Sequence, residues 1–221
     1  MKKIFRISVV AFLIIFMIVP AVTIAQGKIE ISPFAGYMFG GSLNFYEGKL
    51  KADNNLNYGV AMDIKLAEDT QIELMWTQMN TTAQFEPYYG YYDIYDINPY
   101  DMNIGYIQIG GVREMNLDQI RPFGVFTLGT TYFIPKNVTY TDGEPLNIDP
   151  AWKFSMTLGA GAKIWLSDVV GIRLQGNLML PMFWSSTGFA VGTGGSGFYV
   201  GGGTSMVQGN FTGGLIFALG E

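Results

Sequence analysis

Charged side chains are scarce in this sequence, and those in its regular segments are placed for ion pairing rather than catalysis. Buried charges are tolerated only when they are paired, and three acids facing five bases can largely pair. We therefore predict a salt-bridged network that fills the interior of the fold. The alternative is a narrow or gated conduit, in which pairs such as Glu73 with Arg113 or Arg173 rearrange to open a path. The eight charges fall on the polar side of alternating segments: Glu30, Asp63, Lys65, Glu73, Arg113, Lys153, Lys163 and Arg173.

The sequence contains no complete motif for catalysis, for cofactor binding or for metal binding. Acyl hydrolysis or transfer uses a nucleophile that is activated by a base, most often histidine, and this chain has no histidine and no cysteine. The glycine-rich residues 188–203 lack the Lys-Ser/Thr pair and the helix of a phosphate-binding loop, so we expect a flexible extracellular loop there. Asp142, Glu144 and Asp149 lack the spacing of a calcium loop. We expect no enzyme, no cofactor and no metal.

The N-terminal segment has the pattern of an export signal. Lys2, Lys3 and Arg6 precede an apolar run, and Thr23 and Ala25 form a small-x-small cleavage site. We predict that residues 1–25 are a cleaved signal peptide, the alternative being a retained anchor. Three of the 13 basic residues lie in it, so 10 bases face 18 acids in the mature chain, a net charge of −8. This charge disfavours nucleic acid as a partner.

The mature chain alternates between apolar and polar residues over long segments. In residues 152–166, "WKFSMTLGAGAKIWL", the even positions are apolar and most odd positions are polar or small. A period of two predicts a strand, and this one is longer than the usual length of about 5–6 residues. The fourth segment is apolar on both parities, which predicts a bulge or a hydrophobic inner patch. We expect eight strands near residues 28–40, 56–66, 71–81, 102–113, 121–134, 152–166, 169–180 and 207–219.

The links between these strands alternate between short and long. Such alternation places all short turns at one end of an up-and-down sheet and all long loops at the other. Two architectures fit: a soluble lipocalin-like barrel with its apolar face inward, or a transmembrane barrel with that face toward lipid. Strand length, a glycine-rich polar face and aromatics at strand ends such as Tyr37, Phe39, Tyr132, Phe133 and Trp152 favour the transmembrane form. We predict an all-β, eight-stranded antiparallel transmembrane barrel over residues 26–221.

This pattern resembles the OmpA-type and OmpX-type small outer-membrane barrels of diderm bacteria over the whole mature chain. The chain end resembles their assembly signal at Thr212, Gly214, Phe217 and Leu219, although Gly220 and Glu221 follow it. The resemblance implies short periplasmic turns, long extracellular loops, and outer-membrane lipid, lipopolysaccharide and the barrel assembly machinery as partners. We predict a structural, surface-exposed scaffold that stabilises the envelope or presents its loops for adhesion or recognition. A soluble secreted barrel carrying a small ligand remains a further alternative.

One expected extracellular loop is rich in tyrosine and acid. Residues 85–101, "FEPYYGYYDIYDINPYD", hold six tyrosines and four acidic residues. Tyrosine combines a large contact area with a hydrogen-bonding tip, so the loop is a candidate surface for an extracellular protein, glycan or lipopolysaccharide headgroup. The alternative is that its aromatic rings pack on each other or lie at headgroup level. The candidate recognition residues are Tyr88, Tyr89, Tyr91, Tyr92, Asp93, Tyr95, Asp96 and Tyr100.

Overall fold

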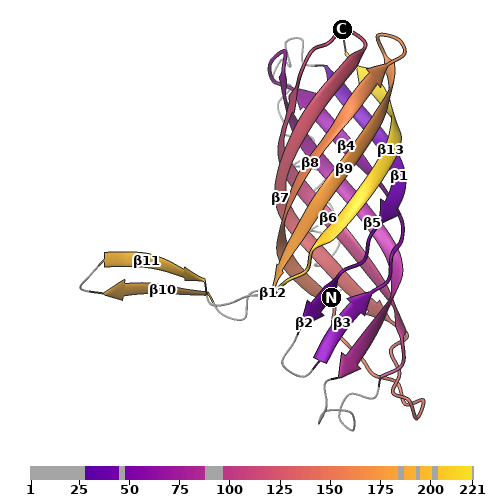
Figure 1. The fold of residues 1–221 in the computed structure, drawn as a ribbon, viewed down its shortest axis with the longest axis vertical. Coiled ribbons are helices and arrows are strands. Elements are labelled where there is room, and N and C mark those ends of the chain that lie inside the picture. The colour runs from indigo at the N-terminus through magenta and orange to yellow at the C-terminus, as the bar shows by residue number, and fades with distance from the viewer. Residues whose placement is uncertain are drawn as a thin grey trace, which may run out of the picture.

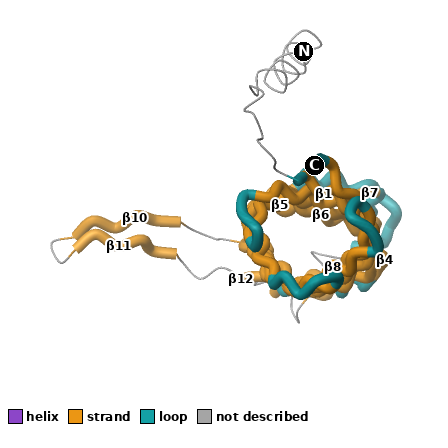
Figure 2. The backbone as a smooth tube through the Cα atoms, turned by 90° about the horizontal axis from the view of Figure 1, so that it is seen from above, coloured by secondary structure: helices purple, strands orange, loops and turns teal. Residues whose placement is uncertain are grey.

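Eight long antiparallel strands close into a barrel (Figures 1 and 2). The computed structural model describes residues 28–44, 48–87, 97–183, 187–192, 195–200 and 204–220, so the predicted signal peptide lies outside the described residues. Neighbouring strands follow chain order, and the last strand pairs with the first. The barrel strands are β1 (Ile29–Met38), β4 (Asn55–Lys65), β5 (Thr70–Pro87), β6 (Tyr100–Glu114), β7 (Ile120–Lys136), β8 (Ala151–Trp165), β9 (Val170–Phe183) and β13 (Gln208–Leu219).

Among the residues that the structure describes, no helix is long and apolar enough to cross a membrane.

The two faces of the barrel wall are inverted relative to a soluble protein. In β8 the inward side chains of Ser155, Thr157 and Lys163 are buried, whereas Phe154 and Leu158 lie exposed on the outer face. Large exposed apolar side chains occur on all eight barrel strands. Lipid can cover such a surface whereas water cannot favourably do so, and this decides the open question in favour of the transmembrane barrel.

The prediction of short turns at one end is confirmed (Figure 1). Residues 66–69, 115–119 and 166–169 connect β4 to β5, β6 to β7 and β8 to β9. In the orientation that the resemblance to outer-membrane barrels implies, these are the periplasmic turns, and the two ends of the barrel are named accordingly. The long connections lie at the opposite, extracellular end.

Additional strands extend the extracellular end, where loops were expected. β2 (Ser42–Asn44) and β3 (Gly48–Ala52) form a hairpin that continues onto β5, which runs further than predicted. β12 (Thr204–Ser205) pairs with β9. β10 (Thr187–Gly192) and β11 (Gly195–Val200) pair with each other. The prediction of a flexible loop over residues 188–203 is therefore wrong for these two strands, because their backbone groups form an antiparallel ladder.

Strand β6 keeps one register along its whole length. Its pairs with β5 run without interruption from Thr70↔Arg113 to Ala83↔Tyr100, so there is no bulge. Ile104 and Tyr106 point inward and are fully buried. The hydrophobic inner patch is therefore the correct one of the two explanations for the irregular fourth segment.

Candidate functional site

Lys163, on β8, lies at the centre of an ionic cluster inside the barrel, near the periplasmic turns. Its Nζ lies 2.6 Å from Oε2 of Glu30 and 2.9 Å from Oδ2 of Asp63. It also donates to Oε1 of Gln71 at 2.7 Å. Oε1 of Glu114 lies 2.5 Å from the same nitrogen, in ion-pair contact but without hydrogen-bond alignment. The side chain of Lys163 is fully buried, so these oxygens replace its water shell.

The arginine of β9 completes the cluster. Arg173 Nη1 donates to Oδ2 of Asp63 at 2.8 Å, and Nη2 pairs with Glu73. Its Nε donates to Oε1 of Gln175 at 2.7 Å. The guanidinium carbon lies 4.7 Å from the ring centroid of Phe123, which supplies a cation–π contact on an otherwise apolar side.

Strand register explains why these groups meet. Glu30 is paired with Asp63, and Asp63 with Glu73, so three carboxylates form a row across β1, β4 and β5. Lys163 is paired with Arg173 across β8 and β9. Like charges on adjacent strands repel. Closure of the barrel brings the acidic row opposite the basic pair and converts two repulsive rows into attraction across the interior.

The cluster holds more acids than bases. Counting Glu114, four buried carboxylates surround two buried cations. Oδ1 of Asp63 and Oε1 of Glu73 are buried and have no hydrogen-bond partner among the described residues. No group of three or more acidic residues in the described part of the chain is arranged to hold a metal ion.

The structure brings together five of the eight predicted network residues: Glu30, Asp63, Glu73, Lys163 and Arg173. The prediction for Arg113 is wrong, because its side chain is 80% exposed on the outer face and pairs with Asp69 at 2.8 Å. Lys65 and Lys153 are half-buried on the inward parity, near opposite ends of the barrel and outside this cluster.

Two polar members were missed. Gln71 precedes Glu73 by one strand period and Glu114 follows Arg113, and both are buried. Inward parity carried from Glu73 along β5 would have identified Gln71.

The extracellular half of the interior contains a large apolar cluster beside buried, uncharged polar side chains such as Thr77, Gln208 and Asn210. Six buried methionines contribute to it, together with aromatic and aliphatic side chains from most barrel strands. Methionine adapts its flexible chain to irregular spaces. We call this group the methionine cluster; its buried members are Met38, Leu43, Ala52, Met75, Met79, Ala83, Tyr100, Met102, Ile104, Tyr106, Phe133, Val138, Met179 and Met206.

Most of the candidate recognition loop lies outside the described residues: Tyr88, Tyr89, Tyr91, Tyr92, Asp93, Tyr95 and Asp96. Tyr100 is described, and its assignment to a recognition surface is wrong. It begins β6 on the inward parity and is only 7% exposed, within the methionine cluster.

The C-terminal signal residues divide between the faces of β13. Phe217 and Leu219 are exposed on the outer face, whereas Thr212 and Gly214 lie on the inward parity. A Cβ at position 214 would lie 2.3 Å from the carbonyl oxygen of Pro33. Glycine therefore permits the close approach of β1 at this point of the closing seam.

An aromatic belt crosses the outer face nearer the extracellular end. Trp76 Nε1 donates to the Tyr132 hydroxyl at 3.2 Å, and that hydroxyl donates to Oε1 of Gln78 at 2.9 Å. The rings of Tyr58 and Trp152 pack against Trp76 and Tyr132, respectively. Rings with polar tips are typical of the interface between lipid tails and water. Phe133, predicted to join such a girdle, points inward instead.

Comparison with known proteins gives matches in structure only. No protein-family profile matches the chain, and neither does any curated protein. Neisserial surface protein A superimposes with a TM-score of 0.54 at 8% identity, over 87% of this chain and 99% of that one.

Two further matches have lower scores. Ail of Yersinia pestis, in complex with a heparin analogue, gives 0.44 at 15% identity, over 87% and 99% of the two chains. The N-terminal barrel domain of Pseudomonas aeruginosa OprF gives 0.41 at 12%, over 86% and 99%. At these identities the matches concern the fold, and the first carries the comparison. Together with strand order and inverted faces, it shows that this chain has the fold of the small eight-stranded outer-membrane β-barrels.

Proposed function

We propose that this protein is a non-enzymatic scaffold of the outer membrane of a diderm bacterium, exported by a cleaved signal peptide. Its barrel serves as a closed anchor, and its extracellular end presents loops for adhesion or recognition. The observation that carries the proposal is the filled interior. The ionic cluster occupies the periplasmic half, and the methionine cluster occupies the extracellular half. An eight-stranded barrel is just wide enough for side chains to fill.

Single-channel recording tests the closed anchor. The mature chain, Gln26 to Glu221, would be refolded and inserted into a planar bilayer. Folding would be verified by a change in gel migration between unheated and boiled samples. We expect no discrete openings from folded protein. Reproducible openings would overturn the closed anchor and support a conduit.

The presenting surface is supported by the extension of the sheet beyond the barrel. β3 continues the ladder of β5 out to Gly48↔Pro87, and Lys51 pairs with Glu86 at 2.5 Å near that edge. The tyrosine-rich residues 88–96 follow directly. A ladder that ends immediately before the loop holds one root of the loop on a rigid support, as binding loops require.

Loop exchange tests recognition. Replacement of Tyr88, Tyr89, Tyr91 and Tyr92 by serine should abolish adhesion of expressing bacteria to immobilised matrix protein or glycan, with unchanged heat-dependent gel migration. The same replacement of exposed Tyr140, which lies in a different extracellular connection, serves as the control. Unchanged adhesion after the fourfold exchange would leave these tyrosines with a packing role only.

A second candidate function is passage of an apolar molecule, and the methionine cluster favours it. Flexible thioether side chains can repack around apolar guests, and the cluster lies in the extracellular half of the interior. Uptake of a fluorescent alkyl probe into vesicles containing the barrel, compared with empty vesicles, distinguishes this candidate from the scaffold.

A further inference from the structure

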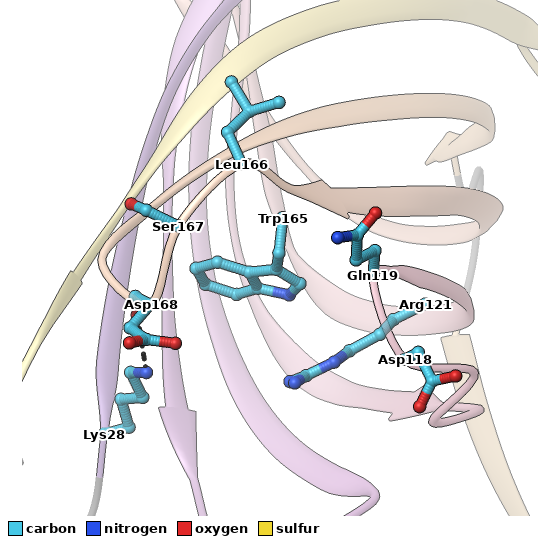
Figure 3. A pocket seen from close by; sticks show the side chains of 8 residues that line it. All are labelled: Lys28, Asp118, Gln119, Arg121, Trp165, Leu166, Ser167 and Asp168. Carbon is cyan, nitrogen blue, oxygen red and sulfur yellow. Dashed lines mark hydrogen bonds between the residues drawn. The ribbon is translucent and has the colours of Figure 1, made fainter.

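The periplasmic mouth of the barrel contains a pocket of about 230 Å³ that the ionic cluster does not use (Figure 3). It lies between the turns at residues 115–119 and 166–169 and the start of β1. Trp165 forms its centre. The ammonium of Lys28 and the guanidinium of Arg121 each lie 5.5 Å from the indole ring, and they approach from different sides of the pocket.

Two buried donors in this pocket are unused. Trp165 is only 9% exposed, and its Nε1 has no hydrogen-bond partner among the described residues. The Nε of Arg121 is likewise buried and unpartnered in that part of the chain. Figure 3 shows the indole nitrogen turned toward Gln119 and Arg121. A buried donor without an acceptor is destabilising, so a pocket with two of them suits a ligand that supplies acceptor oxygens.

The charges of the pocket narrow the ligand to a singly charged oxyanion. Lys28 and Arg121 attract an anion, whereas Asp118 and Asp168 line the same pocket and disfavour a second negative charge. Donors that converge from several directions suit a tetrahedral group better than a planar carboxylate. A phosphodiester is tetrahedral and carries one charge.

The position of the pocket indicates where such a group would come from. Leu166 follows Trp165 in the turn after β8, lines the pocket and is 65% exposed. An exposed leucine next to the buried Trp165 places the pocket at the periplasmic rim of the barrel, at the level expected for headgroups of the periplasmic leaflet.

We propose that Arg121, Lys28 and the indole N–H of Trp165 form a binding site for the phosphate group of a phospholipid of the periplasmic leaflet. This site is independent of the function proposed for the loops. Arg121 is paired in register with Lys163 across β7 and β8, so its replacement can also perturb the ionic cluster. Only a ligand-dependent signal separates the two effects.

The test follows the indole N–H of Trp165 by ¹⁵N NMR in phosphate-free, nonionic micelles of the mature chain. The substitution Trp165→Phe identifies its signal. Addition of phosphatidylglycerol to the micelles should shift that signal to saturation. Arg121→Gln should weaken the apparent affinity about tenfold or more, because charged hydrogen bonds are lost. If Arg121→Gln compromises folding, Lys28→Gln takes its place in the test, and it should also weaken the apparent affinity.

Two controls complete the design. Arg113→Gln removes a cation at the same end of the barrel that faces outward, and it should leave the titration unchanged. Inorganic phosphate at matched ionic strength distinguishes the sources: saturation by lipid at lower concentration supports the headgroup. Saturation by free phosphate alone would overturn the lipid assignment. No saturable shift, or equal shifts in wild type and Arg121→Gln, would overturn the site.

Discussion

Lys163 is the residue on which the ionic cluster most depends. It is fully buried, and it contacts acids from β1, β4 and β6. A lysine in that position is stabilised only by its partners, and the acids are in turn stabilised by it. Removal of one member of a buried ion pair leaves an uncompensated charge, which is far more costly than loss of an exposed pair.

Replacement of Lys163 by methionine should therefore lower the free energy of unfolding by about 3–5 kcal/mol. The measurement is urea-induced unfolding in lipid vesicles, followed by tryptophan fluorescence. Arg113→Gln, which removes an exposed pair, should change the same quantity by about 0–1 kcal/mol. Equal effects of the two substitutions would contradict the central role of Lys163.

Asp69, in a periplasmic turn, makes a contribution to stability that depends on pH. The hydrogen bond from the Thr70 hydroxyl, and then the Arg113 guanidinium, hold the pKa of the Asp69 carboxyl below its ordinary value of 3.8. A lowered pKa means that the folded state favours the carboxylate. Its stabilising contribution is present above pH 3.8 and is lost as the pH falls through the lowered pKa.

Arg113→Gln should raise the pKa of Asp69 toward 3.8, and Thr70→Val should raise it further. A ¹³C NMR titration of the carboxyl group measures both. A pKa unaffected by either substitution would show that neither contact persists in solution.

At the scale of strands, close approach explains where glycine is required. Gly105 in β6 lies beneath the ring of Tyr132, and a Cβ there would be 2.1 Å from the ring carbon Cζ. This glycine lets the tyrosine lie flat against the barrel and reach Trp76 and Gln78. Gly111, in the same strand, has its nearest neighbour at 4.0 Å.

Gly105→Ala should displace Tyr132 and lower the free energy of unfolding by about 1–3 kcal/mol, as expected for overpacking. Gly111→Ala is the matched control and should be nearly neutral. Urea unfolding in vesicles compares the two. A neutral Gly105→Ala would mean that the belt can re-form around an added methyl group.

Sequence periodicity predicted the eight barrel strands because lipid imposes apolar residues on one face along their full length. The signal failed where that contrast disappears. The inner face of β6 enters the methionine cluster, so Ile104 and Ile107 are both apolar although they face opposite sides. The sequence around them therefore did not indicate which alternate residues of β6 face inward, and Arg113 was predicted to face inward in place of Glu114. β2, β3, β10 and β11 lie beyond the lipid-facing wall, where nothing imposes alternation.

Across the whole molecule, two different kinds of side-chain packing close the interior, one after the other along the barrel axis. The periplasmic half depends on charge pairs whose geometry is set by strand register. The extracellular half depends on packing of adaptable side chains. Ions crossing the barrel would have to pass both, so either half alone should be sufficient to block conduction.

This arrangement predicts non-additive conductance. Met79→Ala with Met179→Ala opens space in the extracellular half, and Lys163→Ala with Glu114→Ala removes a cation and an acid from the ionic half. Each pair should remain silent in a planar bilayer, because the other half still blocks the path. All four substitutions together should give discrete openings, with folding checked by gel migration. Conduction by one pair alone would identify the half it alters as the sole barrier, and the other half would then have a structural role only.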